Sequence, residues 1–222
     1  MLEKENGLGK FFTKVYMWMF IGILISGVVA YFTSVSPVMI KYVSDLYIFI
    51  IIAELITVIL FTALRNKVSP GVAKILFIVY SALSGLTLSS IFLLYKIRSI
   101  GTVFYSTSLL FGLMAVYGYV TKQNLTSFGK ILLFGLISVV IMSFINIFVG
   151  NSSFDVFISI ISIAIFLGLT AYDMSRLKQT YDYYSNDPNM LDKASIYGAL
   201  DLYLDFVNIL LKLLSLFGKK KD

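Results

Sequence analysis

Asp201-Leu202-Tyr203-Leu204-Asp205 places two carboxylates four residues apart inside the last long apolar stretch of the chain, residues 194–217. Successive residues of an α-helix turn by about 100°, so Asp201, Asp205, Asn208 and Lys212 fall within roughly 60° of one another. These side chains form one polar stripe on a helix that is otherwise mostly Leu, Ile, Val and Phe. Ionisable side chains at membrane depth are costly and normally face a protein interior or a water-filled path. If this segment spans a bilayer, the stripe is the best functional signal in the chain.

The composition predicts a membrane protein. Of the 222 residues, 59% are hydrophobic and only 14% are charged, whereas a soluble domain is about half apolar and a quarter charged. The net charge of +6 is spread between apolar runs and does not form a nucleic-acid-binding patch. The chain has no Cys and no His, which excludes disulfides, thiol or imidazole nucleophiles and conventional zinc or copper sites. Oxygen ligands remain, and these suit protons and hard cations such as Ca²⁺.

Seven apolar runs approach the roughly 20 residues that a helix needs to cross the hydrocarbon core. We therefore predict an all-α protein of seven transmembrane helices, with residues 1–222 forming a single polytopic domain. The first run is interpreted as a retained helix and not as a signal peptide, because six more spans follow it. Connections are expected to be short except for one loop, Asp173–Lys193, with a turn at residues 186–189. The predicted spans are about 15–33, 46–64, 72–95, 101–121, 128–149, 154–172 and 194–217.

Basic residues in the connections predict a cytoplasmic N-terminus. The tail Lys219-Lys220-Lys221 would then lie outside, against this rule, and a re-entrant last segment is the alternative to seven full crossings. With the N-terminus inside, the outer connections hold Lys41, Lys96 and Arg98, and the inner face holds Lys4, Lys10, Lys14, Arg65, Lys67, Lys74, Lys122, Lys130, Arg176, Lys178 and Lys193.

Asp173, at the end of the sixth span, is the candidate partner of Asp205. If the two helices pack side by side and the carboxylates meet, both cannot ionise cheaply, so they would share a proton. Such a pair would act as a pH sensor and, when deprotonated, as a hard-cation site. The competing interpretation makes Asp173 a solvated helix-end residue beside Arg176. Asp201, nearer the inner surface, is then a residue at the mouth of the ion path or a second ligand of the cation.

Glu54 and Arg65 lie in the second span, eleven residues apart and therefore on almost the same helix face. Glu54 falls inside the hydrocarbon, so we expect it to be protonated or partnered across helices. Arg65 falls at the inner end, where it could clamp Asp173 or simply snorkel to the surface. The small residues of Ser84–Ser90 and Gly112 predict close helix packing.

Tyr172-Asp173 and Asp201-Leu-Tyr-Leu-Asp205-Phe-Val-Asn208 resemble the transmembrane Bax inhibitor motif family, in its bacterial members. The resemblance implies a seventh helix surrounded by the other six, and a pH-sensitive Ca²⁺ leak governed by Asp173 and Asp205. It further implies that Arg65 is the switch partner of Asp173, with Glu54 an acid along the path. The third span lacks the Gly-Pro pair of many members, and the loop before the seventh helix is long.

We accordingly expect a monomeric, non-enzymatic protein of the bacterial inner membrane that passes Ca²⁺ and protons, with Asp201 and Asn208 also on the ion path. No tightly bound cofactor and no nucleic-acid partner are expected. One alternative is an intramembrane aspartyl protease, for which Tyr172-Asp173 fits and Gly198-Ala-Leu-Asp201 only approximates the second motif. The other alternative is a non-conducting regulator that binds other membrane proteins.

Overall fold

The computed structural model describes residues 2–65, 67–121, 123 and 125–221, with residues 2–5 and 127 described by their backbone alone. The described chain is α-helical, apart from an isolated bridge between Tyr95 and Lys220. It divides into a first unit, residues 1–96, 180–203 and 220–222, and a second unit, residues 97–179 and 204–219. The helices are α1 (Leu2–Val35), α2 (Pro37–Asp45), α3 (Tyr47–Ala63), α4 (Pro70–Leu94), α5 (Ile97–Val120), α6 (Thr126–Val149), α7 (Ser152–Tyr184) and α8 (Pro188–Phe217).

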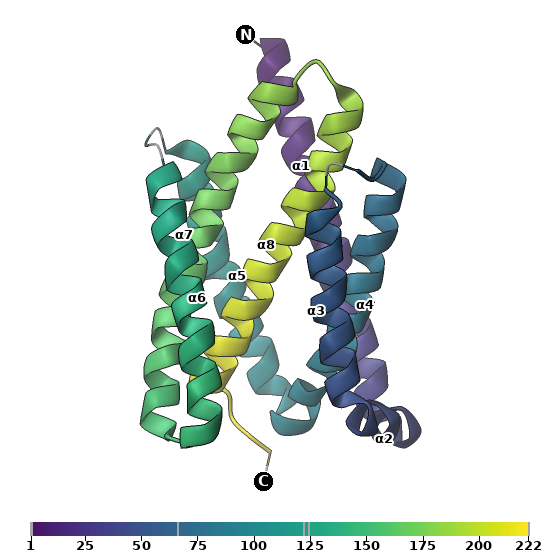
Figure 1. Cartoon of the computed structure of the whole chain (residues 1–222), viewed down its shortest axis with the longest axis vertical. Coiled ribbons are helices and arrows are strands. Elements are labelled where there is room, and N and C mark those ends of the chain that lie inside the picture. The colour runs from purple at the N-terminus through teal and green to yellow at the C-terminus, as the bar shows by residue number, and fades with distance from the viewer. Residues whose placement is uncertain (1, 66, 122, 124, 222) are drawn as a thin grey trace. The chain divides into compact units, whose positions relative to one another are not determined.

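In the first unit α4 packs against both α1 and α3. The approach of α1 to α4 is close at Gly85, where a Cβ atom would lie 2.8 Å from the carbonyl oxygen of Ser26. Proline begins α2 and α4, and the preceding serine caps each helix through its hydroxyl, Ser36 for α2 and Ser69 for α4. The short helix α2 meets α3 at a bend of 73° (Figure 1).

The second unit contains α5, α6, most of α7 and the C-terminal half of α8. Val139 of α6 and Ile158 and Ile165 of α7 form a buried apolar cluster. Phe206 of α8 packs edge-on against Phe104 and Phe111 of α5, with ring centroids 5.4 and 5.7 Å apart. These contacts anchor the part of α8 that carries Asp205 against α5.

The prediction of a long loop at Asp173–Lys193 is wrong. Helix α7 continues to Tyr184, and α8 begins at Pro188, which leaves a turn of only three residues, 185–187. The turn itself falls where Asn186-Asp187-Pro188 predicted it. Asp187 caps α8, because its carboxylate accepts hydrogen bonds from the backbone N–H groups of Asn189 and Met190. The sequence prediction also had no helix at α2, which occupies a predicted connection.

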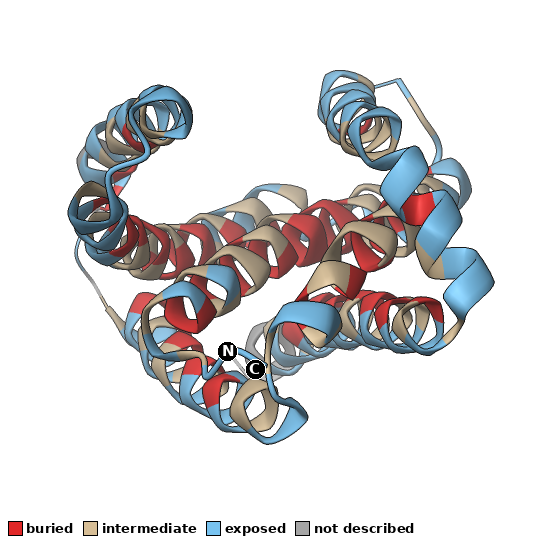
Figure 2. Cartoon of the chain, turned by 90° about the horizontal axis from the view of Figure 1, so that it is seen from below, coloured by how far each residue is buried: buried red, intermediate tan, exposed pale blue. Residues whose placement is uncertain are grey.

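The predicted spans agree with helices α1 and α3–α8 to within a few residues, except that α1, α7 and α8 extend well beyond theirs. Five described helices are long and apolar enough to cross a membrane, or six if α2 and α3 form one broken span. The count of seven therefore stays a prediction. Exposed faces are themselves apolar, as for Phe148 at 76% exposure, and Figure 2 shows exposed residues on the helices next to buried ones. The side chains of Lys4 and Lys122, used to predict orientation, lie outside the described residues.

Candidate functional site

Asp173 and Asp205 are both buried in the second unit, with exposed fractions of 7% and 4%. Asp173 lies within α7, well before the helix ends at Tyr184, so its interpretation as a solvated helix-end residue is wrong. Arg176, one turn further along α7, does pair with it: Nη2 of Arg176 lies 3.2 Å from Oδ1 of Asp173. The Arg176 guanidinium also lies over the ring of Tyr172, 5.6 Å from its centroid. The charged form of Asp173 is therefore compensated within its own helix.

The polar stripe of α8 divides between the two units. Asp201 is partly buried and belongs to the first unit, whereas Asp205 and Asn208 belong to the second. The Asn208 side chain donates from Nδ2 to the carbonyl oxygen of Leu204 at 2.8 Å, the residue one turn earlier. That bond satisfies one donor of the amide and leaves its side-chain oxygen as an acceptor. The pairing of Asp173 with Asp205, and the ion-path roles of Asp201 and Asn208, stay predictions.

Arg65 lies in the first unit, just after α3 ends, and is held by an aromatic ring. Its guanidinium carbon is 5.2 Å from the ring centroid of Tyr197 of α8, a cation–π arrangement. Tyr197 is itself fixed, because its hydroxyl donates to the carbonyl oxygen of Phe61 at 3.0 Å and its ring stacks on the Phe61 ring. The clamp of Arg65 on Asp173 stays a prediction.

Glu54 is partnered across helices, as expected for an acid at membrane depth. Thr87 of α4 donates from Oγ1 to Oε2 of Glu54 at 3.0 Å. Tyr80, also on α4 and buried, lies near enough to the same carboxylate for the two groups to interact electrostatically. A carboxylate with a hydroxyl partner on a neighbouring helix is stabilised at a depth where water is scarce.

The acidic residues bear on whether the chain could hold a metal ion. Within the described residues, no group of three or more Asp or Glu side chains lies close enough to do so. Ca²⁺ takes about six to eight oxygen ligands in proteins. A Ca²⁺ site at Asp173 and Asp205 would therefore need backbone carbonyls or water for most of its ligands, and it stays a prediction.

Comparison with known proteins decides the family. Residues 8–222 match the model of the family described as inhibitor of apoptosis-promoting Bax1. This chain belongs to the Bax inhibitor motif family. It is 39% identical to the inner membrane protein YbhL of Escherichia coli K12 over 224 residues, which cover 99% of this chain and 96% of that protein. It is 38% identical to a protein of Borreliella burgdorferi, over 99% of this chain and 97% of the relative. A membrane protein of Streptococcus pyogenes serotype M1 is 34% identical, over 98% and 96%.

These relatives cover the whole length of the chain, so the predicted resemblance is confirmed. Relatives of this chain are membrane proteins, and the described chain contains several long apolar helices. The chain is therefore an integral membrane protein. Each relative named above comes from a bacterium. None of their names assigns an enzymatic activity.

The structure of this Bax inhibitor family member also contains a polar cluster that the sequence prediction missed. The hydroxyls of Ser26 and Tyr203 are 2.7 Å apart, and Ser26 Oγ lies 2.7 Å from the carbonyl oxygen of Ser81. All three residues are buried in the first unit. The sequence prediction gave no role to Ser26 or Ser81, and it interpreted only the neighbouring segment Ser84–Ser90 as small packing residues. On α4, the spacing of Ser81, Ser84 and Thr87 at every third residue was the available signal for one polar face.

A second missed feature joins three helices of the first unit at the ends of the predicted spans. The carboxylate of Asp192 on α8 lies 2.8 Å from Nζ of Lys74 on α4 and 3.4 Å from Nζ of Lys14 on α1. Partial burial alone would raise the pKa of Asp192, but hydrogen bonds and charge from Lys74 and Lys14 outweigh it. The pKa of Asp192 is therefore held below its ordinary value.

Proposed function

We propose that this protein is a pH-sensitive calcium leak channel of the bacterial inner membrane, gated by protonation of Asp173 together with Asp205. The observation that carries the proposal is the burial of both carboxylates within the helices of one unit. Whether a buried carboxyl group holds its proton depends on the charges and the solvent around it, so such a group can respond to a change in pH. When deprotonated, the two side chains offer oxygen ligands of the kind that Ca²⁺ prefers.

The proposal gives the other predicted residues supporting roles. Arg65 would act as the switch partner of Asp173, while Glu54, Asp201 and Asn208 would line the ion path. Glu54 supports this assignment because it already faces a hydroxyl of neighbouring helix α4 and not lipid alone. A membrane path needs such inward-facing polar groups, since an isolated charge facing lipid is costly.

The same proposal makes α8 the seventh crossing and the central helix, with the N-terminus cytoplasmic. Helix α8 has 30 residues, which at about 1.5 Å per residue is longer than the roughly 30 Å hydrocarbon core. Every residue from 194 to 200 is buried. A helical segment that is buried on all sides lies inside a bundle and not at its edge, which supports a central position for this part of α8.

Ca²⁺ flux into proteoliposomes, measured from acidic to neutral pH, tests the gate. We expect Asp173→Asn and Asp205→Asn each to flatten the pH dependence of flux, because neither amide titrates. Asp155→Asn is the matched control, since Asp155 lies exposed in the first turn of the same helix as Asp173. Flux and pH dependence that stay at the wild-type level in both test variants would overturn the gating role.

The assay also separates the channel from its alternatives. Liposomes that contain only this protein and lipid supply no partner, so a non-conducting regulator would give no flux above empty liposomes. An aspartyl protease needs two carboxylates acting as acid and base on one peptide bond. Cleavage of a transmembrane substrate that stops in Asp201→Ala, with no flux in the wild type, would favour the protease.

A further inference from the structure

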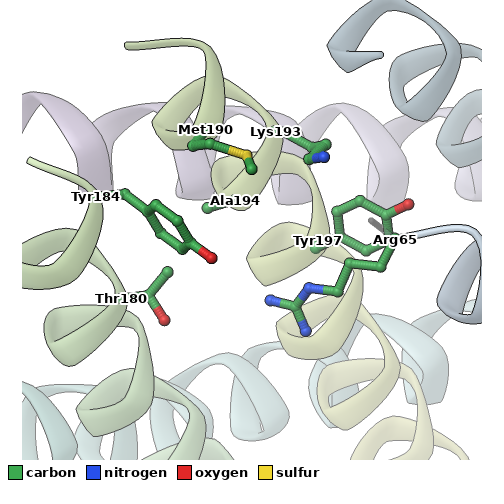
Figure 3. Close-up of a pocket in the computed structure, with 7 residues that line it drawn as sticks. All are labelled: Arg65, Thr180, Tyr184, Met190, Lys193, Ala194 and Tyr197. Atoms are coloured by element: carbon green, nitrogen blue, oxygen red, sulfur yellow. The ribbon is translucent and has the colours of Figure 1, made fainter. Parts of the chain in front are cut away.

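A cavity of about 210 Å³ lies in the first unit, where the end of α3 meets the end of α7 and the start of α8 (Figure 3). It is separate from Asp173 and Asp205, neither of which lines it. Its lining contains two basic residues and no acidic one. The lining residues are Arg65, Thr180, Tyr184, Met190, Lys193, Ala194 and Tyr197. The electrostatic character of this cavity is therefore positive, which disfavours a cation as its occupant.

Arg65 is one of the two sources of that charge, and its guanidinium is held in place. Tyr197 holds the guanidinium by its ring, and Tyr197 is held in turn by its hydrogen bond to Phe61. Within the described part of the chain, no carboxylate pairs with Arg65, and none of its guanidinium N–H groups donates a hydrogen bond to the protein. A partly buried guanidinium without a counter-ion is costly. An anion bound in the cavity would relieve this cost.

Further donors surround the same space. Figure 3 shows the guanidinium of Arg65 and the hydroxyl of Tyr184 directed toward the same part of the cavity, with Thr180 beside them. Lys193 lies at the side, where its ammonium group contacts the carbonyl oxygen of Val68 at 3.5 Å. An ammonium group has three donors, so this single long contact leaves Lys193 able to bind an anion as well. Arg65 and Lys193 are donors only, and the hydroxyl of Tyr184 can donate as well.

We propose that this cavity binds the phosphate group of a small anion, with Arg65 as its principal ligand. A guanidinium presents a planar fork of donors that matches two oxygens of a phosphate, and hydroxyl donors complete the contact. The cavity is smaller than the roughly 300–1,000 Å³ of ordinary small-molecule sites, so it fits a headgroup phosphate and not a nucleotide. The phosphate comes from an anionic phospholipid or from a soluble phosphate ester.

Cytoplasmic-side basic pockets between transmembrane helices are a known place for anionic lipid headgroups, and the predicted orientation puts this cavity on that side. The inference goes beyond the proposed channel and does not require ion conduction. Binding is measured without flux, so failure of one proposal is distinguishable from failure of the other.

Native mass spectrometry of the full chain in detergent, with added lipid, tests the site. We expect phosphatidylglycerol to be bound in preference to zwitterionic phosphatidylcholine, and Arg65→Gln to weaken that binding by about tenfold, the loss of one charge-assisted contact. Lys67→Gln is the matched control, because Lys67 is exposed, lies two residues away and does not line the cavity. Glycerol phosphate, added in a parallel titration followed by thermal unfolding, probes a soluble source.

A milder pair of variants covers the case in which Arg65→Gln does not fold. Tyr184→Phe removes one hydroxyl from the cavity, whereas Tyr183→Phe changes a neighbouring side chain that is 81% exposed and outside it. We expect weaker binding in Tyr184→Phe alone. Binding of phosphatidylglycerol that depends on Arg65 and Tyr184 assigns a lipid, and a thermal shift with glycerol phosphate that depends on the same residues assigns a soluble ester. Binding of both probes that is equal in test and control variants overturns the site.

Discussion

The guanidinium of Arg176 lies 3.2 Å from the carboxylate of Asp173, one helical turn earlier in α7. The aspartate is buried, and the arginine reaches it from a less buried position on the same helix. An opposite charge at this distance favours the ionised form of a carboxylate and offsets part of the penalty of burial. Arg176 is therefore a positioning residue for the proposed gate, a role that the sequence prediction gave only to Arg65.

Replacing Arg176 with Gln should change the pH dependence of Ca²⁺ flux. The substitution removes the positive charge that lies 3.2 Å from the Asp173 carboxylate, so we expect the midpoint of the pH profile to move. Arg176→Lys is the control, because it keeps the charge and should shift the midpoint less. The measurement is proteoliposome flux over a pH series. A midpoint that is the same in wild type and Arg176→Gln would count against the role of Arg176.

Asp192→Asn should lower the stability of the protein at neutral pH but not in strong acid. The folded-state pKa of Asp192 lies below its ordinary value of 3.8. The ion pairs with Lys74 and Lys14 therefore stabilise the fold above that value, and their contribution is lost as pH falls through the lower folded-state pKa. Because both lysines are partly exposed to solvent, each pair contributes up to about 1 kcal/mol.

Thermal unfolding in detergent across a pH series measures the effect of Asp192→Asn. The difference in melting temperature between variant and wild type should shrink toward low pH. Asp45→Asn is the control, since Asp45 is exposed and makes no ion pair with the described residues. A destabilisation that is equal at all pH values would show that Asp192 acts through packing and not through charge.

Tyr203→Phe should destabilise the protein through loss of a buried hydrogen bond. The Tyr203 hydroxyl lies 2.7 Å from Ser26 Oγ and is fully buried. Interhelical hydrogen bonds in membranes contribute about 0.6 kcal/mol on average, so we expect a loss of that order. A double-mutant cycle with Ser26→Ala isolates the pair, and Tyr105→Phe, an exposed tyrosine, is the control. Additive effects of the two mutations would show that the hydroxyls do not couple.

The sequence predicted the positions of the helices well and the extent of α7 poorly. Apolar runs locate membrane spans, but they end where the polar residues begin, at Asp173. The helix continues because the segment up to Asp187 contains no Pro or Gly to stop it. Absence of a helix breaker was the signal that hydropathy alone does not use. Pro188 and the capping carboxylate of Asp187 then start α8 where the turn was expected.

The partners of buried polar residues were not predictable from the sequence. Hydroxyls in membrane helices can bond to their own helix, as Thr107 does to the carbonyl oxygen of Val103. Only the facing helix decides whether such a group also bonds outward, as Ser26 does to Tyr203. The pairing of Lys74 with Asp192 joins residues 118 positions apart, and one sequence does not reveal such a contact.

Two glycines of α5 should respond in opposite directions to replacement by Ala. The sequence prediction expected close packing at Gly112, but a Cβ there would meet nothing within 4 Å, so that expectation is wrong. At Gly118 a Cβ would lie 2.8 Å from the Cα and the carbonyl carbon of Ala171 on α7, and backbone atoms cannot move aside as a side chain can. Gly118→Ala should therefore lower stability by about 1–3 kcal/mol, the usual cost of overpacking. Gly112→Ala should leave stability unchanged or raise it by up to about 1 kcal/mol, because Ala favours the helix over Gly. Thermal unfolding of the two variants in the same detergent compares them directly. Equal melting temperatures would show that α5 and α7 do not approach each other at Gly118 as closely as described.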